Sequence, residues 1–160
     1  YYDLLAKTKK MHKLIGLFGG TFDPVHQGHR CVIESAIKEC QLDEVKVIPN
    51  HIPPHKDRTP TRSIHRLAML KLACASISNT SISTIELERQ GPSYTIDTIT
   101  SIQKSQLDTI FCLILGEDSL ANIKSWYHWE RILNLVHLIV YPRNTHNGIT
   151  QTTRLLKLDN

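Results

Sequence analysis

The sequence predicts an α/β protein with a Rossmann-like, doubly wound parallel sheet of about five strands and helices on both faces. An apolar segment at 14–18 is followed by two glycines and then by a helical pattern. Short apolar strands and helical segments alternate along the rest of the chain, as in βαβ units. The segment 109–115 is almost continuously apolar, which is typical of a parallel strand buried on both faces. Ligands of such sheets bind outside the carboxyl ends of the strands.

The composition is that of one globular domain. The chain has 160 residues, of which 41% are hydrophobic and 21% charged, with a net charge of +4. A mildly basic balance suits an anionic small molecule and does not call for nucleic acid. We interpret residues 1–10 as an N-terminal extension and residues 11–160 as a single domain.

The cysteines and the hydropathy pattern predict a cytoplasmic protein. The four cysteines are scattered and form no Cys-x-x-Cys pair. Free thiols of this kind are typical of a reducing compartment. The chain contains neither a signal peptide nor an apolar run of about 18 residues, so we expect no membrane partner.

The stretch 15–29, Ile-Gly-Leu-Phe-Gly-Gly-Thr-Phe-Asp-Pro-Val-His-Gln-Gly-His, organises the rest of the chain. Gly19 and Gly20 end the strand and permit a tight turn. Pro24 prevents an early helix, and helical spacing then predicts a helix over 27–41. A helix that starts after a glycine turn directs free backbone N–H groups at an anion. The stretch therefore predicts a site for the phosphates of a nucleoside triphosphate.

Two histidines, His26 and His29, stand at the predicted helix start. An imidazole there can donate a hydrogen bond to phosphate oxygens. The simplest alternative is that the Gly-Gly turn only ends a strand and that the two histidines are surface residues without a role in binding. A zinc site is another, because His26-x2-His29 and His51-x3-His55 have zinc-like spacing. A structural zinc site needs four ligands, and no cysteine pair supplies the rest, so we expect no metal ligand among the side chains.

The string Gly-Gly-Thr-Phe-Asp-Pro-Val-His-Gln-Gly-His resembles the (H/T)xGH signature of nucleotidyltransferases, relatives of class I aminoacyl-tRNA synthetases. Within them it is most similar to the bacterial nicotinate-mononucleotide adenylyltransferase family, over about residues 11–143. The resemblance implies transfer of AMP from ATP to nicotinate mononucleotide, which gives deamido-NAD and pyrophosphate. The reaction would be a direct in-line attack on the α-phosphate in NAD biosynthesis. Mg²⁺ would be bound mainly through the ATP phosphates.

The resemblance also implies which residues form the site. Those expected in catalysis are His26, His29 and Lys56. Those expected to bind ATP are Gly19, Gly20, Thr21, Phe22, His26, Gly28, His29, Gly116, Asp118 and Arg143. Asp118 follows the strand at 109–115 and would accept hydrogen bonds from ribose hydroxyls, although a helix cap is the alternative role for its side chain.

Three further stretches are expected to form the part of the site that binds nicotinate mononucleotide. Pro-Pro-His-Lys resembles the second fingerprint of the family, and Glu-x-x-Arg-x-Gly-Pro-Ser-Tyr-Thr-x-Asp-Thr resembles the third. Trp-Tyr resembles the pair that holds the pyridine ring, where the tryptophan stacks on the ring and backbone amides meet the carboxylate. The contacts expected from these stretches and their neighbours are Asn50, His55, Thr95, Trp126 and Tyr127.

Periodicity and breakers predict the remaining elements. We expect strands at 44–49, 81–87 and 137–141. We expect a helix over 63–76 whose inward side chains are mostly Ile64, Leu67, Ala68, Met69, Leu72 and Ala75. Arg66 falls on the other face of that helix. Ser93 or Thr95 is expected to cap the next helix, and Trp129 is expected in the core.

The family's string Ile-Ser-Ser-Thr-x-Ile-Arg does not occur in this sequence. Two alternatives stay open beside the transferase, and the missing string favours the first of them. One is a catalytically silent nucleotide-binding module, and the other is phosphopantetheine adenylyltransferase, which usually carries Thr at the His26 position. A homo-oligomer is compatible with the sequence.

Overall fold

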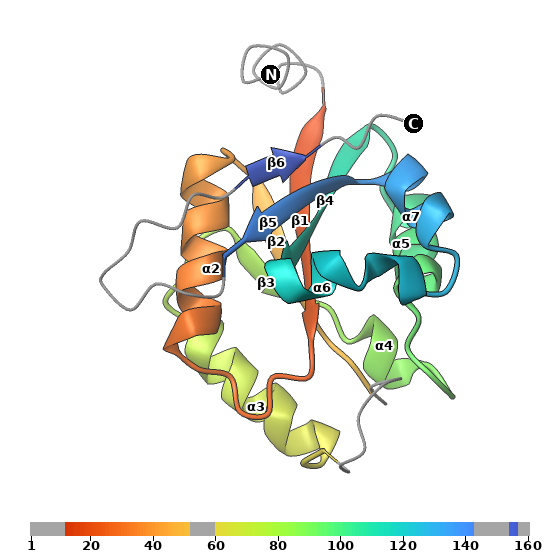
Figure 1. Cartoon of the computed structure of the whole chain (residues 1–160). Helices are drawn as coiled ribbons and strands as arrows, with labels where there is room; N and C mark the ends of the chain where they lie inside the picture. The colour runs from red at the N-terminus through yellow and green to blue at the C-terminus, as the bar shows by residue number, and fades with distance from the viewer. Residues whose placement is uncertain (1–11, 52–59, 143–153, 157–160) are drawn as a thin grey trace.

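A single twisted sheet forms the centre of the molecule (Figure 1). The computed structural model describes residues 12–51, 60–142 and 154–156, the last three by their backbone alone. The strand order is β3-β2-β1-β4-β5-β6. The strands are β1 (Lys13–Gly20), β2 (Glu44–Pro49), β3 (Thr80–Ile82), β4 (Thr109–Gly116), β5 (His137–Tyr141) and β6 (Arg154–Leu156).

The first five strands are parallel, as the sequence predicts. Because β1 lies between β2 and β4, the chain reverses its direction of winding at β1. Such a switch point is where open α/β sheets bind ligands. The strand β6 is an addition that the sequence analysis missed. It pairs antiparallel with β5, with Val140 opposite Arg154.

Helices cover both faces of the sheet. The described helical elements are α2 (Gln27–Glu39), α3 (Ser63–Cys74), α4 (Ile85–Glu88), α5 (Thr95–Ser105), α6 (Glu117–Ala121), the 3₁₀ turn η1 (Ile123–Ser125) and α7 (Trp129–Leu135). The helix predicted over 27–41 and the strands predicted at 44–49 and 137–141 are confirmed to within two residues.

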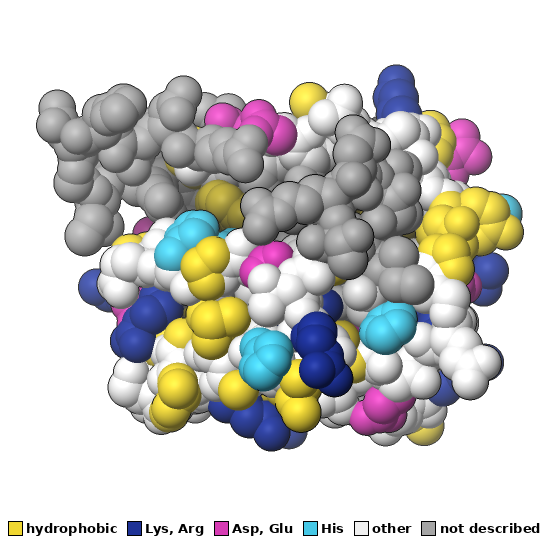
Figure 2. Space-filling model, turned by 90° about the horizontal axis from the view of Figure 1, so that it is seen from below, with side chains coloured by type: hydrophobic (Ala, Val, Ile, Leu, Met, Phe, Trp, Pro, Cys, Tyr) yellow, Lys and Arg dark blue, Asp and Glu magenta, His cyan; other side chains and the backbone are white. Residues whose placement is uncertain are grey.

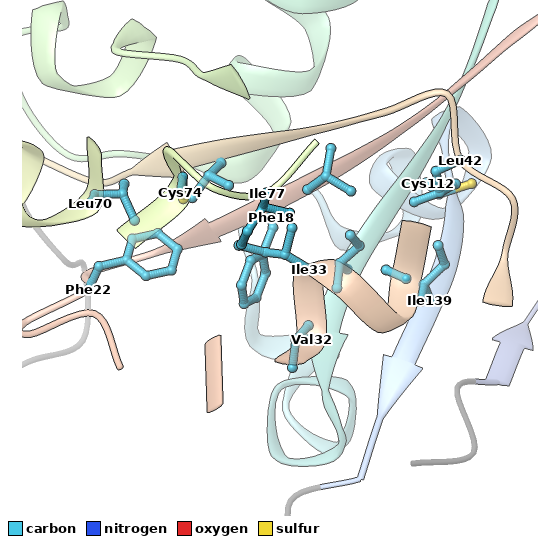
Figure 3. Packing of buried hydrophobic residues seen from close by; sticks show 14 of the residues in the cluster. Phe18, Phe22, Val32, Ile33, Leu42, Leu70, Cys74, Ile77, Cys112 and Ile139 are labelled. Carbon is cyan, nitrogen blue, oxygen red and sulfur yellow. The ribbon is translucent and has the colours of Figure 1, made fainter. Parts of the chain in front are cut away.

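The alternation of side chains along β1 divides the core in two. Leu14 and Phe18 point to the face covered by α2 and α3, where they join a cluster with Ile33 and Leu70 (Figure 3). Ile15 and Leu17 point to the opposite face, where α5 and α7 contribute to a second cluster. Both faces of the sheet are therefore buried, which explains why the central strands are continuous apolar runs.

The face of α3 that turns inward differs from the prediction. Its buried side chains are Arg66, Leu70 and Cys74. Leu72, predicted inward, is 79% exposed, and Ile64 is also exposed. These three residues have the i, i+4, i+8 spacing of a helical stripe, in which the arginine is buried with its hydrogen-bond partners.

The strand predicted at 81–87 is also partly wrong. The strand β3 ends at Ile82, and a single helical turn, α4, begins at Ile85. The apolar positions 82 and 85 are three apart, which does not fit a strand's period of two. The turn buries Glu86, whose carboxylate accepts a hydrogen bond from the hydroxyl of Thr98 at 2.7 Å.

Candidate active site

The strand β1 leads into a tight turn built on a buried phenylalanine. Phe22 has φ of +50°, and its side chain is 2% exposed. Left-handed backbone is unusual for a bulky residue, and such strain clusters at functional sites. The ring also occupies the space beside Gly20, where a Cβ would lie 3.1 Å from the ring. Phe22 was expected to bind ATP, but its side chain belongs to the core, so that only its backbone can face a nucleotide.

The two histidines of the motif form one unit at the start of α2. His26 is the N-cap residue, with extended backbone, and its N–H donates to Nδ1 of His29 at 3.2 Å. The two imidazole rings stack with their centroids 3.8 Å apart. A Cβ at Gly28 would lie 2.9 Å from Cε1 of His26. A side chain at position 28 would therefore displace the His26 ring, which folds over Gly28.

His29 is held neutral, with a defined tautomer. Burial, and secondly the neighbouring His26, lower the pKa of His29 from about 6.5 to about 4. Its Nδ1 accepts the hydrogen bond from the backbone, so in the neutral ring the proton is on Nε2. The ring also packs edge-on against Phe22, with centroids 5.0 Å apart. His29 therefore presents Nε2–H as a hydrogen-bond donor near neutral pH.

The backbone at the start of α2 adds further donors. The first N–H groups of a helix have no partner within it. The first turn carries no acidic side chain. The helix has 13 residues, so its dipole is well developed at this end. Together with His29 Nε2–H, the turn after β1 is suited to bind an anion such as a phosphate group.

Arg66 is the principal residue that the sequence analysis placed wrongly. It is 1% exposed and lies under the turn. Its guanidinium donates to the carbonyl oxygens of Thr61, Thr21 and Asn50 at 2.8, 2.8 and 2.9 Å. An arginine on the same helical stripe as Leu70 was the signal that could have revealed its burial.

Asn50, which was expected at the mononucleotide, and Asp23 also help to fasten this region. The N–H of Asn50 donates to the carbonyl of Gly20 at 2.9 Å, and its amide Nδ2 donates to the hydroxyl of Thr21 at 3.4 Å. Asn50 Oδ1 is buried and has no hydrogen-bond partner among the described residues. Asp23 Oδ2 accepts from the N–H of Thr61 at 2.9 Å. The turn is therefore bound to the end of β2 and to the start of α3.

A buried carboxylate organises the segment before α5. Burial raises the pKa of Glu86, while Thr98, Arg89 and Ser93 act to lower it. Ser93 Oγ also accepts from the N–H of His51 at 3.3 Å, which links this segment to the end of β2. These contacts give a physical reason for the Glu-x-x-Arg and Ser-Tyr-Thr-x-Asp-Thr pattern.

Thr95 is the first residue of α5 and is half-buried. The N-cap of this helix is Tyr94, with no hydrogen bond from a capping side chain, so the prediction that Ser93 or Thr95 caps it is wrong. The ring of Tyr94 packs on Tyr127, with centroids 4.8 Å apart. The third sequence stretch therefore meets the Trp-Tyr stretch directly.

The carboxyl end of β4 carries Gly116 and Asp118. Gly116 is the N-cap of α6, and Asp118 is exposed in the first turn of that helix. The alternative role of Asp118 as the cap is therefore wrong. β4 pairs with β1 along the switch point, so both strands end at the same edge of the sheet. Figure 2 shows the molecule from this side, where histidine, basic and hydrophobic side chains lie interspersed.

Both tryptophans are half-buried, and they differ in what they pack against. Trp126 is half-buried and packs against the second core cluster. Trp129, expected in the core, is only half-buried and lies under Lys124, whose Nζ is 5.9 Å from the ring centroid. Tyr127 is 54% exposed and packs between Tyr94 and His128. Trp126 therefore has a fixed position with part of its surface free.

Three expected site residues, His55, Lys56 and Arg143, lie outside the described residues. Within the described parts of the chain, no group of three His, Cys, Asp or Glu side chains could hold a metal ion. In the same parts of the chain, no helix combines the length and apolar character needed to span a membrane.

The fold and this edge of the sheet define a parallel α/β protein with a candidate anion site at the carboxyl ends of its strands. Residues 17–157 match the model of the Cytidylyltransferase-like family. A probable nicotinate-nucleotide adenylyltransferase of Aeromonas salmonicida is 44% identical over 81% of this chain and 60% of the relative. One of Albidiferax ferrireducens is 43% identical over 85% of this chain and 69% of the relative.

Two solved structures have a similar fold. The Plasmodium falciparum nicotinic acid mononucleotide adenylyltransferase complexed with NaAD is 25% identical, with a TM-score of 0.72 over 86% of this chain and 68% of that one. A putative nicotinate-nucleotide adenylyltransferase from Vibrio parahaemolyticus is 21% identical, with a TM-score of 0.71 over 83% of this chain and 76% of that one, and shows likeness of fold.

This chain therefore belongs to the Cytidylyltransferase-like family, and within it to the nicotinate-nucleotide adenylyltransferases. It spans about 60% of the length of the Aeromonas salmonicida relative.

The depressed pKa of His29 predicts a dependence of stability on pH. Because the unfolded chain takes up a proton near pH 6.5 that the folded ring rejects until about pH 4, folding stability should fall as pH drops across this window. His29→Asn keeps an acceptor near the Nδ1 position but does not titrate. Urea unfolding at several pH values should therefore give a smaller loss of stability for this variant between pH 6.5 and 4.

The matched control is His65→Asn, because His65 is an exposed histidine of α3. It should follow the wild-type dependence on pH. An unchanged dependence in His29→Asn would contradict the assigned protonation of His29.

Proposed function

We propose that this protein transfers AMP from ATP to nicotinate mononucleotide, which yields deamido-NAD and pyrophosphate. The observation that carries the proposal is the neutral, Nε2-protonated His29 at the start of α2, beside the glycine turn. It occurs in a chain that is 43% identical to a probable nicotinate-nucleotide adenylyltransferase. The relative solved with NaAD supports the same substrate class.

In this reaction a phosphate oxygen of the mononucleotide attacks the α-phosphorus of ATP. The bond from the α-phosphorus to the oxygen bridging to the β-phosphate breaks, and pyrophosphate leaves with that electron pair. Such a transfer depends on positioning and charge stabilisation and needs no covalent intermediate. His29 Nε2–H, the exposed His26 and the N–H groups at the start of α2 would donate to phosphate oxygens. Gly19, Gly20 and the backbone of Thr21 would line the turn.

The acceptor, nicotinate mononucleotide, would lie near the contact between the rings of Tyr94 and Tyr127. Thr95 and Asn50 would contact the mononucleotide, and the free surface of Trp126 would stack on its pyridine ring. Such stacking contributes about 0.5–1.5 kcal/mol beyond the area buried. Asp118, exposed at the end of β4, would accept from ribose hydroxyls of ATP. His55, Lys56 and Arg143 keep the roles expected from the sequence.

Mg²⁺ would bind mainly to the phosphates of ATP. The described residues supply no cluster of oxygen ligands, whereas triphosphate oxygens and water are the ligands that Mg²⁺ prefers in such sites. The ion would offset charge on the phosphates.

His29→Ala should lower kcat by about 10²-fold, because it removes one preorganised donor to the phosphates. His29→Gln should retain more activity than His29→Ala, since its amide can donate near the Nε2 position. A pyrophosphate-release assay with ATP and nicotinate mononucleotide measures both. The control is His65→Ala on α3, which should keep wild-type kcat.

The same assay separates the alternatives. Release with phosphopantetheine in place of the mononucleotide would indicate the other adenylyltransferase. Calorimetric binding of ATP without turnover by any acceptor would indicate a silent binding module. The first outcome would refute the proposed acceptor, and the second would refute the proposed transfer. Wild-type kcat in a folded His29→Ala variant would refute the proposed role of His29.

Removal of divalent cations should abolish turnover while leaving the fold intact, because the ion would be bound through the nucleotide. Chelation followed by addition of Mg²⁺ should restore the rate, and circular dichroism should not change in either step. A chelator-induced loss of secondary structure would contradict this mode of binding.

A further inference from the structure

Arg66 joins three separate parts of the chain under the proposed phosphate site. Its Nη1 bonds the carbonyl of Thr21, which follows β1. Its Nη2 bonds the carbonyl of Asn50, which follows β2. Its Nε bonds the carbonyl of Thr61, just before α3. One side chain therefore sets the spacing between the exits of two neighbouring strands and the entry to a helix.

Other bonds reinforce the same three segments. Asp23 of the turn accepts from the N–H of Thr61, and the N–H of Asn50 donates to the carbonyl of Gly20. The carboxylate of Asp23 also acts to raise the pKa of Arg66, against the effect of burial. The charge of the buried guanidinium is therefore partly compensated within the junction, where Nε, Nη1 and Nη2 each donate to a carbonyl oxygen.

The chemistry of this junction favours arginine over other residues. A planar guanidinium offers donors in fixed directions, whereas the ammonium of lysine is a single centre on a flexible stem. Three carbonyls approached from Nε, Nη1 and Nη2 use that planar geometry fully. Burying a charged group costs free energy. An arginine that is only 1% exposed therefore indicates that the hydrogen bonds to the three carbonyls are needed, because an apolar side chain could not form them.

We propose that Arg66 is a positioning residue for adenylyl transfer, fixing the turn after β1 relative to the end of β2 without touching the substrates. This inference rests on the proposed function, because it assigns Arg66 to the geometry of that site. A displacement of about 1 Å of groups that hold reactants can cost about 10²-fold in rate. The arginine would therefore act on kcat through the placement of His29 and Asn50.

The test compares Arg66→Lys with wild type. The variant keeps the positive charge and a long stem, so it should fold, but it cannot reach all three carbonyls. Rates normalised to folded protein should show kcat reduced by about 10–100-fold, with KM for either substrate changed less than kcat. Hydrogen exchange of the Asn50 and Thr61 amides should accelerate relative to amides of β4.

The matched control is Arg30→Lys. Arg30 donates to the carbonyl of Ala73 at 2.9 Å and to the hydroxyl of Ser76 at 3.0 Å, so it fastens the opposite end of the same helix, α3. Its normalised kcat should stay within about twofold of wild type, because its side chain contacts the end of α3 and the substitution leaves the backbone at the start of α2 unchanged. The Asn50 and Thr61 amides should exchange as in wild type.

Wild-type normalised kcat in Arg66→Lys, or unchanged exchange at both amides, would overturn the inference. Equal losses in the two lysine variants would assign Arg66 a purely structural role and would also overturn it. If wild type transfers AMP to no acceptor, the proposed function fails. Arg66 is then judged by exchange at these amides and by the calorimetric affinity for ATP, which Arg66→Lys should weaken and Arg30→Lys should not.

Discussion

The hydrogen bond from the backbone of His26 to Nδ1 of His29 is the interaction on which the site depends. It orients the second imidazole, fixes its tautomer and leaves Nε2–H as the outward donor. Partial burial keeps the ring neutral, so that it donates without carrying charge. Gly28 is part of this arrangement because any larger residue would displace the His26 ring. The pair is thus a geometric unit, in which each member sets the position of the other.

The sheet explains why such a unit can serve catalysis. The order of the parallel strands places the ends of β1, β2 and β4 at one edge. Each strand end is followed by polar or glycine residues, whereas the strands themselves are buried on both faces. Rigid apolar strands therefore support a polar rim that is held by backbone hydrogen bonds. Arg66 and Glu86 are buried near that rim, on helices that pack on opposite faces of the sheet.

Much of the fold could be predicted because its signals are local. Apolar runs at 14–18 and 109–115 and the Gly-Gly turn indicate parallel strands directly, and the histidine pair indicates an anion site. The buried roles of Arg66 and Glu86 were missed because charged residues are usually exposed, and only tertiary carbonyl and hydroxyl partners reverse that expectation. Phe22 was expected at the ligand from its motif, yet its left-handed backbone turns the ring into the core.

Nitrogen NMR of the His29 imidazole near pH 7, with and without ATP, tests the proposed role of this residue most directly. We expect a neutral ring protonated on Nε2, whose Nε2 resonance shifts when ATP is added while Nδ1 changes little. A charged ring, the opposite tautomer, or an Nε2 signal that ignores saturating ATP would contradict it.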